Sequence, residues 1–117
     1  MESKEFIRGT IKTLVLKLLS EKKKMYGYEI SAKVMELSGN EIQLTYGALY
    51  PILYKLEAEG LLSTESELVD NRARKYYSLT KKGNEVAKVK VSELAKFMDI
   101  VKNILNTPKA SFESWAY

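Results

Sequence analysis

The segment 45–62, TYGALYPILYKLEAEGLL, constrains the fold more than any other part of the chain. Its aliphatic residues recur at helical spacing, which predicts one amphipathic helix with a single buried stripe. The stripe consists of Leu49, Ile52, Leu53 and Leu56. At about 100° per residue, the opposite face collects uncharged residues, namely Gly47, Tyr50, Pro51 and Tyr54. A solvated helix face usually carries lysine and glutamate, whereas this one carries no carboxylate. We therefore expect it to contact another molecule.

A basic hairpin is predicted directly after this helix. Gly60 supplies a left-handed C-cap, and the β-prone runs 61–69 and 74–79 flank the turn pair Asp70-Asn71. Three cations follow the turn, namely Arg72, Arg74 and Lys75. A helix followed by a cationic hairpin is the plan of a winged helix-turn-helix. In that plan a recognition helix enters the DNA major groove and the wing contacts the flanking phosphates.

Composition excludes most catalytic chemistry. The chain has 117 residues, enough for one domain with one appended element. It contains no Cys and no His, which excludes disulfides, thiolate nucleophiles, imidazole bases and nearly every metal site built from nitrogen or sulfur ligands. The close carboxylate pairs Glu57/Glu59 and Glu65/Glu67 are interpreted as solvated surface charges. We predict no catalytic residue, no metal and no cofactor, and hence no enzyme.

The charge of the chain is compatible with a nucleic-acid partner. There are 19 basic and 15 acidic side chains, and the net charge of +4 permits DNA binding without proving it. The cluster 22–24 of three lysines is interpreted as a solvated turn, with a phosphate contact as the alternative. No apolar run approaches the roughly 18 residues that span a bilayer, and the N-terminus lacks the apolar region of a signal peptide, so we expect a cytoplasmic protein without membrane contact.

Two further helices are predicted before the tyrosine-bearing helix. Apolar residues at positions 7, 11, 14, 15 and 18 recur at helical spacing and predict a helix over 4–19. A second helix is predicted over 26–37, because Ser38-Gly39-Asn40 is a stop signal. Thr45 can then accept a backbone hydrogen bond as the N-cap of the third helix.

Residues 80–117 are predicted to form a dimerisation helix and an aromatic tail, appended to a DNA-binding domain over 1–79. Thr80 caps a helix that continues to about Asn106. Its apolar seam repeats with heptad spacing and consists of Ala87, Val91, Leu94, Met98, Val101 and Leu105. Long exposed apolar stripes mark interfaces, so we expect this seam, together with Ile11, to pair two subunits. Folding back onto the first helix is the single-chain alternative. The tail either frays or docks its rings on the dimer core.

Three motifs in the chain are similar to those of a known family. They are Tyr26-Gly27-Tyr28-Glu29-Ile30, the stretch 47–61 that contains Gly-Ala-Leu-Tyr-Pro, and Arg72-Ala73-Arg74-Lys75-Tyr76-Tyr77-Ser78-Leu79-Thr80 with Gly83. With them the chain resembles the PadR-like bacterial transcriptional regulators, which are small winged-helix repressors. The chain departs from the common pattern at Ala48, where the family often has Thr, and at Ala73, where it often has Pro at the wing tip.

The resemblance implies a mainly α fold with a small β-hairpin, in which a winged helix-turn-helix domain is joined to a single C-terminal dimerisation helix. We expect a homodimeric repressor that binds a palindromic operator of double-stranded DNA. The residues expected at the DNA are Thr45, Tyr46, Gly47, Tyr50, Pro51, Tyr54, Lys55, Arg72, Arg74 and Lys75. A winged-helix module that binds only protein is the alternative.

Members of the short subfamily look like sensors with a ligand pocket between the two C-terminal helices, lined by aromatic residues that include a Trp. Leu94 falls at the place of that Trp, so a flat stacking platform is missing there, whereas Phe97 lies one turn away and Trp115 could reach in from the tail. We therefore expect a small aromatic or cationic effector near Leu94, Phe97 and Trp115, with a regulator that has no effector as the alternative.

Overall fold

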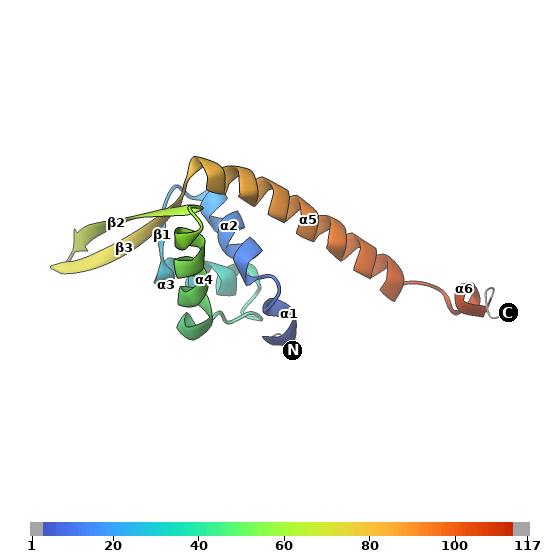
Figure 1. Cartoon of the computed structure of the whole chain (residues 1–117). Helices are drawn as coiled ribbons and strands as arrows, with labels where there is room; N and C mark the ends of the chain where they lie inside the picture. Colours follow the sequence, from blue (N-terminus) through green and yellow to red (C-terminus); the bar gives the residue numbers. More distant parts are fainter. Residues whose placement is uncertain (1–3, 114–117) are drawn as a thin grey trace.

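The computed structural model describes residues 4–113, which form a cluster of helices, a small three-stranded sheet beside it and one long helix. The elements in order are α1 (Lys4–Ile7), α2 (Ile11–Glu21), β1 (Met25–Tyr26), α3 (Gly27–Leu37), α4 (Tyr46–Ala58), β2 (Leu62–Val69), β3 (Arg72–Leu79), α5 (Lys81–Leu105) and α6 (Lys109–Glu113). Helices α2, α3 and α4 cluster together, and the hairpin β2–β3 and helix α5 leave that cluster in different directions (Figure 1). The predicted fold class is confirmed: the chain is mainly helical, with a winged helix-turn-helix arrangement and a long C-terminal helix.

The sheet has the antiparallel order β1–β3–β2. Asp70 and Asn71 both have positive φ, of 51° and 63°, and connect Val69 to Arg72 by the two-residue turn that suits the twist of a hairpin. The predicted hairpin is confirmed, although β3 begins at Arg72 instead of position 74. Strand β1 was not predicted. Two residues are too few to show the alternation by which a strand is recognised in a sequence. Tyr26, expected as the first residue of the helix over 26–37, therefore belongs to β1 instead.

The recognition-helix candidate α4 is positioned by its caps and its buried stripe. The Thr45 side chain accepts a hydrogen bond from the Ala48 backbone N–H at 3.2 Å, as predicted for an N-cap. Gly60, at φ +78°, ends the helix, and the Leu61 N–H then bonds the Leu56 carbonyl at 2.9 Å. Three leucines of the predicted stripe are fully buried against α2 and α3, namely Leu49, Leu53 and Leu56. Ile52 is half-buried.

The expectation of one continuous helix over 4–19 is wrong. The backbone N–H of Thr10 donates to the Ile7 carbonyl at 2.8 Å, and the Thr10 hydroxyl donates to the same oxygen at 3.0 Å. Both bonds close a turn, so α1 ends at Ile7 and α2 begins at Ile11. Gly9 favours this break because glycine costs roughly 1 kcal/mol relative to alanine inside a helix.

Helix α5 is as long as the sequence predicts. The Thr80 side chain accepts from the Gly83 N–H at 3.0 Å, and 25 helical residues follow, which span about 37 Å. Its first turns are anchored by Gly83 and Ala87, which are buried, and the rest leads away from the helix cluster toward α6 (Figure 1). The longest dimension of the molecule is consequently 69 Å. Within residues 4–113, no helix is both long enough and apolar enough to cross a membrane.

Candidate nucleic-acid interface

The outward face of α4 is a row of tyrosines. Tyr46 and Tyr54 are 50% and 54% exposed, and Tyr50 lies between them with its ring centroid 5.8 Å from that of Tyr46 and 5.9 Å from that of Tyr54. We call these three residues the tyrosine row. Gly47 and Pro51 are exposed beside it, as are Thr45 and Lys55 at its edges. The structure therefore brings together the residues of α4 and its N-cap that sequence reasoning assigned to DNA.

Tyr50 differs from its neighbours because it is half-buried. It crosses the first turn of α3 at Gly27, where an added Cβ would lie 2.3 Å from the Tyr50 hydroxyl oxygen. Burial raises the pKa of Tyr50, and the adjacent phenols Tyr46 and Tyr54 raise it further. The Tyr50 hydroxyl therefore stays protonated at neutral pH and can donate a hydrogen bond.

Lys75 of β3 links the hairpin to α4. Its Nζ lies 3.6 Å from Glu57 Oε1, 5.5 Å from the Tyr54 ring centroid and 5.3 Å from the Tyr77 ring centroid. Desolvation lowers the pKa of Lys75, but Tyr77 and Glu57 outweigh it and the net shift is upward. The cation is thus kept beside the end of the tyrosine row, between helix and hairpin.

Arg72 and Arg74 lie on the opposite face of the hairpin, because alternate residues of a strand point to opposite sides. The Arg74 guanidinium carbon is 4.3 Å from the centroid of the Tyr26 ring, and that ring is stacked on Tyr28 at 6.2 Å. Arg72 is exposed. Sequence reasoning treated the three cations of the wing as one group, whereas the fold divides them between two faces.

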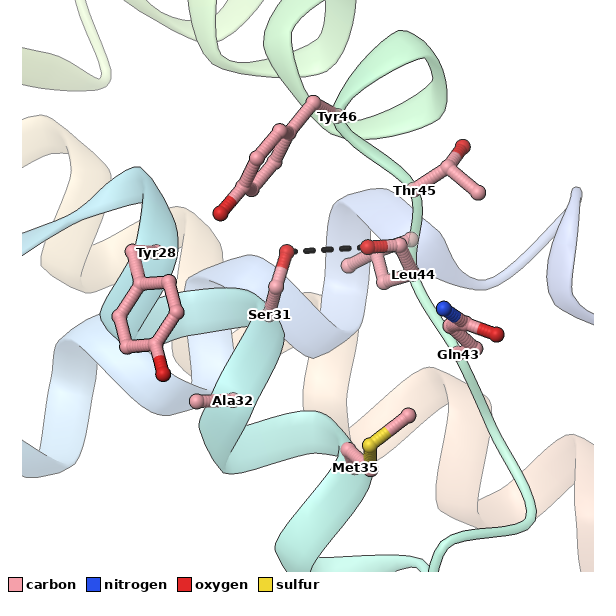
Figure 2. A pocket seen from close by; sticks show the side chains of 8 residues that line it. All are labelled: Tyr28, Ser31, Ala32, Met35, Gln43, Leu44, Thr45 and Tyr46. Carbon is pink, nitrogen blue, oxygen red and sulfur yellow. Dashed lines mark hydrogen bonds between the residues drawn. The ribbon is translucent and has the colours of Figure 1, made fainter.

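A pocket of about 420 Å³ opens between α3 and the start of α4 (Figure 2). The rings of Tyr28 and Tyr46 stand at its rim, and the Ser31 hydroxyl donates to the Leu44 carbonyl at 3.0 Å across its wall. Its lining comprises Tyr28, Ser31, Ala32, Met35, Gln43, Leu44, Thr45 and Tyr46. Sequence reasoning missed the residues of α3 here. Their only signal was the motif at 26–30, which does not reveal that the N-terminus of α3 lies beside that of α4.

The seam of α5 is anchored at one end and open at the other. Val91, Leu94 and Val101 are half-buried, whereas Met98 and Leu105 are 61% and 77% exposed. A second flank of this helix is also exposed and consists of Phe97, Ile100 and Ile104.

A groove of about 680 Å³ runs between α1, α2 and the distal half of α5. Leu94 and Phe97, two of the three residues expected at a ligand, line it. Trp115, the third, lies outside the described residues, and Phe112 of the tail is exposed. Ile11, expected at the subunit interface, is only 6% exposed and belongs to the core of its own chain.

Comparisons with known proteins agree with this geometry. The family model of the transcriptional regulator PadR-like family matches residues 15–89. An uncharacterized protein of Lysinibacillus sphaericus is 33% identical over 107 residues, which are 91% of this chain and 94% of that protein. A transcriptional regulator from Clostridium thermocellum, Cth-833, superposes with a TM-score of 0.77 at 27% identity, covering 88% of this chain and 97% of that one. A PadR family transcriptional regulator from Eggerthella lenta DSM 2243 superposes with a TM-score of 0.71 at 35% identity, covering 89% and 88%.

Proposed function

We propose that this chain, which belongs to the PadR-like family of transcriptional regulators, is a homodimeric repressor that recognises a palindromic operator. Membership of the family implies DNA binding and a non-enzymatic function. The observation that supports recognition of an operator is the exposed face of α4, where Tyr46, Gly47 and Tyr54 are presented without a carboxylate. Such a face can approach a polyanion without electrostatic repulsion.

In this proposal α4 lies in the major groove. The phenols of the tyrosine row donate to base edges or phosphates, and their rings contact thymine methyl groups. Gly47 and Pro51 allow the DNA to approach the helix closely, since neither has a long side chain. Thr45 and Lys55 contact phosphates at the two edges of the groove.

The hairpin supplies the flanking contacts. Lys75 is held between the hairpin and α4, so a phosphate at the edge of the major groove is within its reach. Arg72 and Arg74 project from the other face and contact the next phosphates or the minor groove. Positive side chains at the phosphates account for most of the affinity of such proteins and for its dependence on salt.

The distal half of α5 supports the assignment of a dimer. Met98, Ile104 and Leu105 are each more than 60% exposed, and an apolar surface of this extent marks an interface. A two-fold dimer requires a palindrome with half-sites one or two helical turns apart, about 34 Å for each turn. A dimer bound over a promoter excludes RNA polymerase sterically, which is why we propose repression.

The test is fluorescence anisotropy with DNA from upstream of the protein's own gene. Arg72→Gln/Arg74→Gln should weaken binding and reduce the slope of log K against log salt by about 0.9 for each lost phosphate contact. Lys96→Gln/Lys109→Gln removes the same charge far from the proposed interface and should bind as the parent does. Equal salt slopes for the two variants would contradict the assigned site.

The same titrations distinguish the rival function. A chain that retards no DNA at low salt would be a protein-interaction module instead. Repression is tested by transcription in vitro from the bound promoter, where the parent should reduce the yield of transcript and Arg72→Gln/Arg74→Gln should not. An increase in transcript would make the protein an activator.

The groove along α5 favours a second function, the sensing of a small aromatic effector. Its lining is mostly apolar and includes Phe97, Leu94 and Phe6, and its 680 Å³ suits a planar molecule. An effector releases the operator only if it binds one arrangement of the dimer better than the other. We expect a panel of planar cations and phenolic acids to raise the melting temperature, and Phe97→Ala to abolish the rise. No shift with any of them would indicate a regulator without an effector.

A further inference from the structure

The hairpin that we assign to DNA is not cationic by itself. Residues 62–79 contain three acidic side chains (Glu65, Glu67 and Asp70) and three basic ones (Arg72, Arg74 and Lys75), so their formal charge is zero. A neutral hairpin gains no net attraction to a polyanion. Contact with phosphates therefore requires that the carboxylates be held away from the arginines.

The strand register places a carboxylate directly opposite Arg74. Glu67 is the cross-strand partner of Arg74, and Glu65 is the partner of Tyr76 on the same face. Residues directly opposite each other on antiparallel strands have Cβ atoms about 5 Å apart, and opposite charges there attract. Glu67 is thus placed to neutralise the arginine that should bind DNA.

In the structure, however, Glu65 and Glu67 both pair with Lys24. Its Nζ donates to Glu65 Oε1 at 3.2 Å, forms an ion pair with Glu67 Oε2, and lies 5.0 Å from the Tyr76 ring centroid. These two carboxylates raise the pKa of Lys24, so it remains a cation. Arg74 is stacked on Tyr26, and a hydrogen bond with the Tyr76 side chain and the charge of Asp70 raise its pKa. Within residues 4–113 it has no carboxylate at ion-pair distance, because Glu65 and Glu67 are the partners of Lys24.

The short strand β1 brings Lys24 to this position. Met25 pairs with Tyr77 and Tyr26 pairs with Tyr76, so the chain just before β1 runs along the face that carries Glu65 and Glu67. Met25 is 2% exposed and anchors the strand from the other face. Tyr26 of this two-residue strand therefore stacks on Arg74, and the residue just before the strand, Lys24, is the counter-ion of Glu65 and Glu67.

We propose that Lys24 is a positioning residue of the wing: it holds Glu65 and Glu67 so that neither forms an ion pair with Arg74, whose guanidinium can then bind a phosphate. The proposal rests on the proposed role of the wing in DNA binding. It differs from both interpretations of the lysine cluster, a solvated turn or a phosphate contact. The neighbours of Lys24 are not equivalent to it, since Lys22 pairs with Glu29 at 2.6 Å and Lys23 is exposed.

The test is a cycle of four full-length proteins: the parent, Lys24→Gln, Glu65→Gln/Glu67→Gln, and the triple variant. DNA affinity is measured by anisotropy for each. Lys24→Gln should lower the affinity roughly fivefold in the parent, because Glu67 then captures Arg74, and less than twofold once both glutamates are neutral. Lys23→Gln is the matched control, which removes the same charge from the same loop and should lower the affinity less than twofold.

A direct phosphate contact by Lys24 would produce the same loss of affinity in both backgrounds, and that result would overturn the proposal. So would an equal loss in Lys23→Gln, or no loss in Lys24→Gln.

A second measurement needs no DNA. The NMR signal of the Arg74 Nε–H should move in Lys24→Gln and return in the triple variant; a signal that stays in place would also overturn the proposal. If that signal moves as expected but the parent binds no DNA, the proposed function fails while the arrangement of charges stands.

Discussion

Individual side chains explain why α4 keeps one face free. Thr45 caps the helix with its own hydroxyl, so no neighbouring element has to cover the first turn. Tyr50 is placed by contact with Gly27, and Tyr46 and Tyr54 remain half exposed on either side of it. The tyrosine row therefore combines one phenol in a fixed position, Tyr50, with two exposed phenols, Tyr46 and Tyr54, that can adjust to a ligand.

Substitution of Gly47 should change the stability of the fold and the affinity for DNA in opposite directions. An added Cβ would meet nothing within 4 Å, and Ala has a higher helix propensity, so Gly47→Ala should raise the free energy of unfolding by up to about 1 kcal/mol. If DNA approaches the helix at this residue, the methyl group should lower the affinity about tenfold. Thermal melts and anisotropy measure the two effects. Ser92→Ala, on exposed α5, is the control that should gain stability and bind DNA as before.

Gly27 should act on DNA through Tyr50. In Gly27→Ala the new methyl group displaces the Tyr50 ring, a side chain that can rotate outward without moving the backbone, so we expect a loss of DNA affinity with only a small loss of stability. Since the effect passes through the ring, Gly27→Ala should have no further effect on affinity in a Tyr50→Ala background. Additive losses of affinity in this cycle would show that Gly27 acts by another route.

Pairs of elements are joined at close backbone contacts. The N-terminus of α5 meets the turn between α4 and β2, where the Thr80 hydroxyl donates to the Gly60 carbonyl at 2.7 Å and the Thr80 N–H donates to the Leu61 carbonyl at 3.0 Å. These bonds tie the recognition helix, the wing and the long helix to one point. A change in the direction of α5 is thereby coupled to the elements that we assign to DNA.

Gly83 is the residue that permits this junction. An added Cβ would lie 2.0 Å from the Leu61 carbonyl oxygen, a backbone atom that cannot move alone, so Gly83→Ala should destabilise the fold by about 1–3 kcal/mol. The comparison is Gly9→Ala, whose Cβ would meet nothing within 4 Å and which should change stability by less than about 0.5 kcal/mol. Urea denaturation of both variants measures the difference, and equal midpoints would exclude a tight junction.

Over residues 4–113 the molecule is elongated because α5 continues beyond the core that its first turns contact. Phe97, Met98 and Leu105 are exposed on the part that extends, and a second subunit is the partner that we propose for them. The distance between the two recognition helices would then be set by how two copies of α5 pair.

Met98 tests the pairing. Met98→Glu places a charge in the proposed seam, where burial without a partner is costly, so the dimer should dissociate at micromolar concentration. Light scattering after size-exclusion chromatography measures the mass. Asn103→Glu adds the same charge to an exposed position of the same helix and should leave the mass unchanged. A parent that is monomeric at high concentration would contradict the dimer.

Local chemistry was sufficient to predict several features from the sequence. The caps Thr45, Gly60 and Thr80, and the turn at Asp70-Asn71, lie where they were expected, because each depends on a hydrogen bond or a φ angle within a few residues. The apolar spacing of α4 likewise predicts its buried face, where Leu49, Leu53 and Leu56 are fully buried. These features need no knowledge of distant neighbours.

Contacts between distant residues could not be predicted in this way. Strand β1 forms because Met25 and Tyr26 pair with Tyr77 and Tyr76 of β3. Lys24 pairs with Glu67, which is 43 positions away in the sequence. The division of Arg74 and Lys75 between two faces follows from a register that the tertiary structure selects. Local spacing determines which residues lie together on one helix face, whereas packing alone decides which charges meet across the sheet and which of them remain free for a partner.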